Sequence, residues 1–93
     1  MQKLLQDISF GKNLQKLRKA RKLSQYDIVR EFELRDRGMT RANYAHIEQG
    51  IRNLYISDLI LLKEILNVSY DDFFEGLSEE DHFAEAENRE KDR

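Results

Sequence analysis

The feature that most constrains this chain is a pair of helix-start patterns between residues 23 and 50. At the first, Ser24 can accept from the free N–H groups of a helix, and Asp27 follows at the spacing of a capping box. At the second, Thr40 takes the same position before a helix that Gly50 would end. The sequence therefore predicts two short helices joined by a turn.

The second of these helices has an uneven distribution of residue types. Tyr44 and Ile47 stand three positions apart, so they share one face, which we expect to be buried. The turn before it contains Gly38, which suits a left-handed exit from the preceding helix. The remaining side chains of the second helix would face outward, and these are Arg41, Ala42, Asn43, Ala45 and His46. They are available to bind a partner.

The rest of the chain predicts further helices and no strands. Apolar residues recur at helical spacing over 9–22, and the segment 59–66 is the most apolar stretch. Ser69 and Asp72 repeat the capping pattern before a short last helix that Gly76 closes. We therefore expect an all-α fold of five helices.

These motifs together resemble the helix-turn-helix domain of the Xre-like (Cro-type) repressor family. The resemblance runs from about Phe10 to Phe74, and it rests on the order and spacing of several short motifs rather than on any one of them. Its motifs are Leu-Arg-Lys-Ala-Arg at 17–21, Leu-Ser-Gln at 23–25, Ile-Glu-Gln-Gly at 47–50 with Arg52-Asn53, and Leu-Asn-Val-Ser at 66–69. The resemblance implies a compact lambda-repressor-like fold and a sequence-specific DNA-binding transcriptional regulator, a repressor.

Two positions depart from the family pattern. Leu54 stands where the family usually has a proline, and the segment between the two motif helices is several residues longer. We expect residues 33–37 either to extend the first motif helix or to lengthen the turn.

The resemblance and the residue types together assign the DNA contacts to the region around residues 40–49. Arg41 can reach a guanine edge or, equally, a phosphate, and Asn43 can pair with adenine or simply cap the helix. The expected base contacts are Arg41, Ala42, Asn43 and His46. The expected backbone contacts are Gln25, Thr40, Arg52 and Asn53.

The resemblance also implies an internal ion pair and a homodimer. Arg18 and Glu48 resemble a family pair that joins the first helix to the end of the recognition helix. One helix-turn-helix reads only a few base pairs, so two copies on a palindrome are expected. The candidate dimer residues are Leu54, Tyr55, Ile56 and Phe74, and the alternative is that they fill the monomer core.

The net charge of −2 hides a division along the chain. Residues 12–52 carry 11 Lys and Arg against 5 Asp and Glu, whereas residues 53–93 carry 4 against 12. The expected DNA-reading helix thus lies in the basic half, as phosphate binding requires. The acidic half should face away from DNA.

The residue types argue against catalysis. The chain has no cysteine, and its two histidines, His46 and His82, have no metal-ligand spacing, so we expect no enzyme, metal or cofactor. No segment is apolar for the length of a membrane span, and the N-terminus lacks the apolar core of a secretion signal. We expect a cytoplasmic protein.

The last sixteen residues differ in composition from the rest. Residues 78–93 hold 7 acids and 3 bases with few apolar side chains, so we expect a partly helical or disordered acidic tail after a domain at 1–77. This tail supports an alternative function. The chain would then be an antitoxin-like or partner-binding module that contacts a protein through its acidic C-terminal part.

Overall fold

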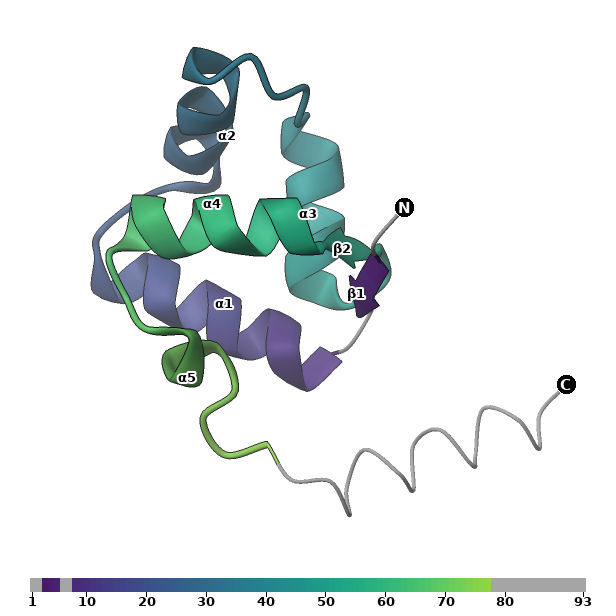
Figure 1. The fold of residues 1–93 in the computed structure, drawn as a ribbon, viewed down its shortest axis with the longest axis vertical. Coiled ribbons are helices and arrows are strands. Elements are labelled where there is room, and N and C mark those ends of the chain that lie inside the picture. The colour runs from purple at the N-terminus through teal and green to yellow at the C-terminus, as the bar shows by residue number, and fades with distance from the viewer. Residues whose placement is uncertain (1–2, 6–7, 78–93) are drawn as a thin grey trace, which may run out of the picture.

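The computed structural model describes residues 3–5 and 8–77, which form helices around one core (Figure 1). The elements in chain order are β1 (Lys3–Leu5), α1 (Ile8–Ala20), α2 (Gln25–Leu34), α3 (Arg41–Gln49), β2 (Leu54–Tyr55), α4 (Ile56–Leu66) and α5 (Tyr70–Phe73). The five expected helices are present among these residues. The expected acidic tail, residues 78–93, lies outside the described residues.

Three helices begin at the predicted caps. Ser24 Oγ accepts the backbone N–H of Asp27 at 3.0 Å, and the Asp27 carboxylate accepts the backbone N–H of Ser24 at 2.8 Å. Thr40 caps α3 by accepting the N–H of Asn43, and Ser69 begins α5 with a second capping box. Each such bond satisfies a donor that the first helical turn leaves unpaired and is worth about 1 kcal/mol.

The longer segment between the two motif helices both extends the first helix, α2, and lengthens the turn before α3. Helix α2 continues to Leu34, and residues 35–40 form the turn. The prediction that Gly38 takes the left-handed conformation is wrong, because Asp36 takes it instead, with φ of 58°. A short polar side chain makes aspartate one of the few residues that tolerate this region. Gly50, with φ of 78°, ends α3 as predicted.

The expectation of no strands is also wrong. Strands β1 and β2 form a short antiparallel ribbon in which Lys3 lies opposite Tyr55 and Leu5 opposite Leu54. Strands of three and two residues are too short to show the alternating pattern that identifies a strand in a sequence. The ribbon joins the N-terminal segment to the start of α4.

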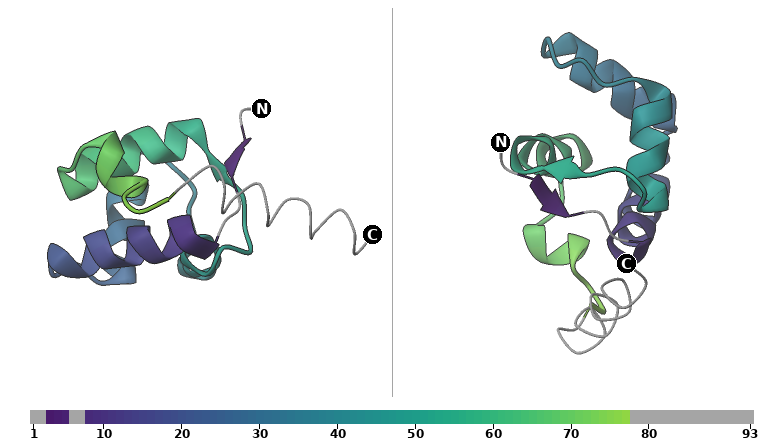
Figure 2. Two further views of the ribbon diagram at one scale, coloured as in Figure 1. Left: turned by 90° about the horizontal axis from the view of Figure 1, so that it is seen from below. Right: turned by 90° about the vertical axis from the view of Figure 1, so that its right-hand side faces the viewer.

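The helices form two groups with the core between them. Figure 2 shows α1, α2 and α3 on one side of the domain and α4 and α5 on the other. Asn13 of α1 holds α5 in place by donating its side-chain amide to the carbonyl oxygens of Phe73 and Glu75, each at 2.9 Å. The buried apolar core consists of Phe10, Leu14, Ile28, Val29, Phe32, Tyr44, Ile47, Leu54, Leu59, Leu61, Leu62, Leu66 and Phe73.

Candidate nucleic-acid interface

Helix α3 presents one mostly polar face to solvent. We define this outer face as Arg41, Ala42, His46 and Gln49, all of which are exposed. Ala42 and Gln49 lie about two turns apart and form its centre line, with Arg41 and His46 on either side. Asn43 is half-buried and lies at the edge. Gln49 was not predicted from the sequence, although its spacing of seven residues from Ala42 is a helical repeat that places both on one face.

The opposite side of α3, the inner face, consists of Tyr44, Ile47 and Glu48, all buried. Helix α1 packs directly on the backbone here, at Gly11. A Cβ atom at Gly11 would meet the Glu48 carbonyl oxygen and lie 2.7 Å from the Glu48 carbonyl carbon and 2.9 Å from the Ile47 carbonyl oxygen. Only glycine permits this approach, so α1 fixes the position of α3 and hence of its outer face.

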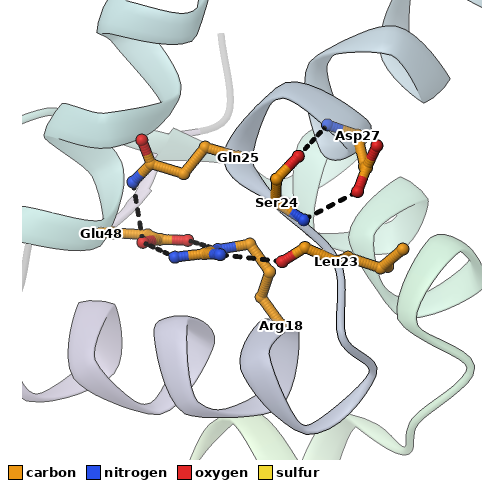
Figure 3. A network of polar contacts seen from close by, with 6 residues as sticks. All are labelled: Arg18, Leu23, Ser24, Gln25, Asp27 and Glu48. Atoms are coloured by element: carbon orange, nitrogen blue, oxygen red, sulfur yellow. Dashed lines mark hydrogen bonds and ion pairs between the residues drawn. The ribbon is translucent and has the colours of Figure 1, made fainter.

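A buried polar network joins α1, α2 and α3 (Figure 3). Arg18 Nε donates to Glu48 Oε2 at 2.7 Å, and a second guanidinium nitrogen donates to Oε1 at 3.1 Å. The side chains of the pair are only 9% and 3% exposed. The third guanidinium bond goes to the carbonyl oxygen of Leu23 at 2.8 Å, just before α2 begins. One arginine thus positions both motif helices.

The charges of this network are mutually stabilised. The hydrogen bond to Glu48 raises the pKa of Arg18 even though burial opposes it. Burial alone would raise the pKa of Glu48, but the hydrogen bonds from Arg18 and Gln25 outweigh burial and lower it. Burial raises the pKa of the neighbouring Tyr44 hydroxyl. The pair is therefore charged, and the tyrosine neutral, at ordinary pH.

Gln25, expected to contact the DNA backbone, lies in the same network. Its side-chain amide donates to Glu48 Oε1 at 3.0 Å, and the residue is half-buried at the start of α2. An amide group carries two N–H hydrogens, so this bond is compatible with a phosphate contact through the second one. The DNA contact of Gln25 stays a prediction.

The other three expected backbone contacts lie near the two ends of α3. Thr40 is exposed, and its hydroxyl accepts the helix-capping bond from Asn43. Arg52 is exposed and Asn53 half-buried, just after α3. Arg52 and Asn53 help to line a hollow of about 140 Å³ that Arg37 of the α2–α3 turn also lines. The fold thus brings the turn before α3 close to the segment after it.

The four dimer candidates divide by exposure. Leu54 is 1% exposed, so its side chain fills the monomer core and offers no dimer surface; this is the alternative that the sequence left open. Its burial follows from its place in β2, directly before α4. Tyr55 is half-buried, whereas Ile56 is 40% and Phe74 39% exposed. Ile60, one turn after Ile56 on α4, is also exposed.

The division of charge along the sequence becomes a division in space. Residues 12–52, with their basic excess, include most of α1 and all of α2 and α3. Residues 53–77, with one lysine and five acids, include α4 and α5. Because the two groups of helices lie on opposite sides of the core (Figure 2), the outer face belongs to the basic side.

The described residues show no sign of a metal centre or a membrane anchor. Within 3–5 and 8–77, no three His, Asp or Glu side chains gather as metal ligands would. None of the helices in that part of the chain is long and apolar enough to cross a membrane.

Helices α2 and α3, with the turn between them, define a helix-turn-helix domain. No protein-family model matches the chain, and no curated protein matches it. Among solved structures, it is similar to the restriction-modification controller protein C.AhdI from Aeromonas hydrophila. The TM-score is 0.62 and the identity 25%, over 72% of this chain and 94% of the controller protein.

Proposed function

We propose that this chain is a DNA-binding transcriptional regulator that reads the major groove with α3. The observation that carries the proposal is the outer face of α3, a polar surface on a helix whose inner face is fixed by Gly11 and Arg18. Such a helix holds its exposed side chains in one orientation, which recognition of a DNA base sequence requires. The likeness to a controller protein supports a regulatory role.

The residues of this interface have two kinds of task. On the outer face, Arg41 is placed to contact a guanine edge, Ala42 to let the helix approach a base, and His46 and Gln49 to donate to base edges. Asn43, at the edge of that face, stays a candidate for adenine. The backbone contacts, which fix the register without reading sequence, come from Gln25, Thr40, Arg52 and Asn53.

The regulator acts as a homodimer on a palindromic site and represses by occupancy. One copy of α3 reads too few base pairs for a specific site, whereas two copies one DNA turn apart read enough. The dimer surface lies on the acidic side, where Ile56 and Ile60 form an exposed apolar strip on α4, with Tyr55 and Phe74 as further candidates. This placement leaves the outer face free for DNA.

A binding titration on duplex DNA at several salt concentrations tests the proposal. Phosphate contacts release counterions, so affinity should fall steeply as salt rises, and one selected sequence should bind more tightly than random DNA. Binding without salt dependence would favour the protein-interaction module. Sedimentation should show a dimer on a palindromic site, and a monomer both free and bound would refute the dimer.

A further inference from the structure

The turn between α2 and α3 contains two arginines in different surroundings. Arg37 lines the hollow of about 140 Å³ together with Arg52 and Asn53, which follow α3 in the chain. Arg35 lies on the α2 side, where its guanidinium binds the carboxylate of Glu31 at 2.8 Å and the Glu31 carbonyl oxygen at 3.0 Å. The side chains of the two arginines are almost equally exposed, at 40% and 41%.

The acid that faces Arg37 is Asp58, in the first turn of α4. The guanidinium lies 3.7 Å from the carboxylate, a loose ion pair, and the Asp58 side chain is only 14% exposed. Asp58 also lines the hollow. Without Arg37, its negative charge would repel any anion that approached Arg52 and Asn53. The pair therefore sets the electrostatic character of the hollow.

A phosphate is the anion that fits this arrangement. The residues that line the hollow include two arginines and one asparagine, next to Phe32, Met39 and Tyr55, and its volume is about 140 Å³. Guanidinium groups bind phosphate oxygens in a planar, two-bond geometry, and an amide adds a neutral donor. Gly38, which also borders the hollow, has no atom within 4 Å of its Cβ position, so the turn leaves space there.

We propose that Arg37 binds a DNA phosphate, jointly with Arg52 and Asn53, and that Asp58 holds the guanidinium in place until DNA arrives. This inference rests on the proposed DNA-binding function. Arg37 exchanges its loose ion pair with Asp58 for hydrogen bonds to phosphate oxygens. The longer α2–α3 turn thus adds a backbone contact beside those of Arg52 and Asn53, which follow α3.

The test compares the slope of log affinity against log salt for Arg37→Gln, Arg37→Lys and the matched control Arg35→Gln, on one duplex. Each phosphate contact contributes about 0.9 to the slope on duplex DNA. Arg37→Gln should reduce the slope by about this amount for each protomer bound to the duplex, whereas Arg37→Lys and Arg35→Gln should keep it. Equal reduction in Arg35→Gln and Arg37→Gln would overturn the inference, because the effect would then be one of general charge.

A variant at Asp58 distinguishes phosphate binding by Arg37 from a purely structural role of the Arg37–Asp58 pair. Asp58→Asn removes the ion pair and the negative charge, so affinity for DNA should rise; if the pair only holds the turn, affinity should fall as in Arg37→Gln. In the Asp58→Asn background, Arg37→Gln should still lower the slope, and an unchanged slope there would overturn the inference. The unmodified protein tests the proposed DNA binding itself. If its DNA binding does not depend on salt, both proposals fail. If its binding does depend on salt, the role of Arg37 is tested by the variants alone.

Discussion

The inner and outer faces of α3 are made by the same nine-residue helix, and they differ in what they tolerate. The inner face packs on α1 at Gly11 with no room for a single Cβ atom, and it contains the buried Arg18–Glu48 pair. On the outer face, Arg41, Ala42, His46 and Gln49 are exposed. The difference implies that inner-face changes should alter stability first, whereas outer-face changes should alter DNA preference without altering stability.

The largest effect expected is that of Gly11→Ala. Alanine in a helix interior normally stabilises by about 1 kcal/mol relative to glycine. Here its Cβ would overlap the backbone of α3, so we expect a net loss of about 3 kcal/mol in the free energy of unfolding, measured by chemical denaturation.

Gly38→Ala is the matched control for this variant. Gly38 lies outside the left-handed region and has open space at its Cβ position, so stability should stay the same or rise by about 0.5 kcal/mol. If Gly11→Ala were as stable as the unmodified protein, the close packing of α1 on α3 would be refuted.

The second prediction concerns variants that break the Arg18–Glu48 ion pair of the inner face. Arg18→Met and Glu48→Leu should each cost about 3 kcal/mol, because each leaves the partner's charge buried and unpaired. The double variant should lose less than the sum of the two, since neither charge is then stranded. The exposed Glu31–Arg35 pair provides the comparison, and breaking it should cost under about 1 kcal/mol. Similar losses for both pairs would contradict the burial argument.

The third prediction concerns acid. The pKa of Glu48 is lower in the folded protein than its ordinary value of 4.5, so its contribution to stability is complete above that value and is lost as the pH falls through the lower, folded-state pKa. Unfolding curves between pH 7 and pH 2 should show a steeper loss for the unmodified protein than for Glu48→Gln, which has no proton to take up. Parallel curves would assign the acid sensitivity to other carboxylates, such as Asp27, whose pKa the Ser24 backbone N–H also lowers.

The fourth prediction moves to the outer face. Arg41→Ala should leave the free energy of unfolding unchanged, reduce affinity for the preferred site by about 1 to 3 kcal/mol and relax the preference at one base pair. Arg52→Ala should instead weaken binding to all sequences about equally. If Arg41→Ala lowers affinity for specific and random DNA by the same factor, Arg41 contacts a phosphate.

The smallest effect expected is that of Gln49→Ala, on the last turn of α3. Because Gln49 lies about two turns from Ala42 along the same line, it should contact the DNA at a different base pair from Arg41. We expect a loss of about 1 kcal/mol on the preferred site and a changed preference at that pair, as read by selection from a random DNA library. An unchanged selected sequence would remove Gln49 from the reading surface.

Local features could be predicted well from the sequence, whereas only some contacts between distant segments could. Ser24, Thr40 and Ser69 were recognisable as caps because a cap and its partner lie three residues apart. The family resemblance pointed to the pairing of Arg18 with Glu48, which lie far apart in the chain. Nothing marked Gly11 as a packing position, since its need for glycine comes from the backbone of another helix.

The errors have the same origin. Gly38 was the natural choice for a left-handed residue, yet the length of α2 placed that conformation at Asp36. Leu54 was proposed for a dimer surface, but pairing with Leu5 in the ribbon and packing before α4 bury it in the core. In each case a local preference was outweighed by a contact or a length that is set elsewhere.

The sequence by itself determined the helical class, the starts of α2, α3 and α5, and the separation of basic from acidic residues, because these depend on residue types at short spacing. Only the tertiary structure decided that Gln49 belongs to the exposed face of α3, how α1 fixes that helix, and that Arg37, Arg52, Asn53 and Asp58 line one hollow. Those features require backbone segments from different parts of the chain to lie within a few ångströms of each other. That proximity depends on packing the whole core, which no short stretch of sequence contains.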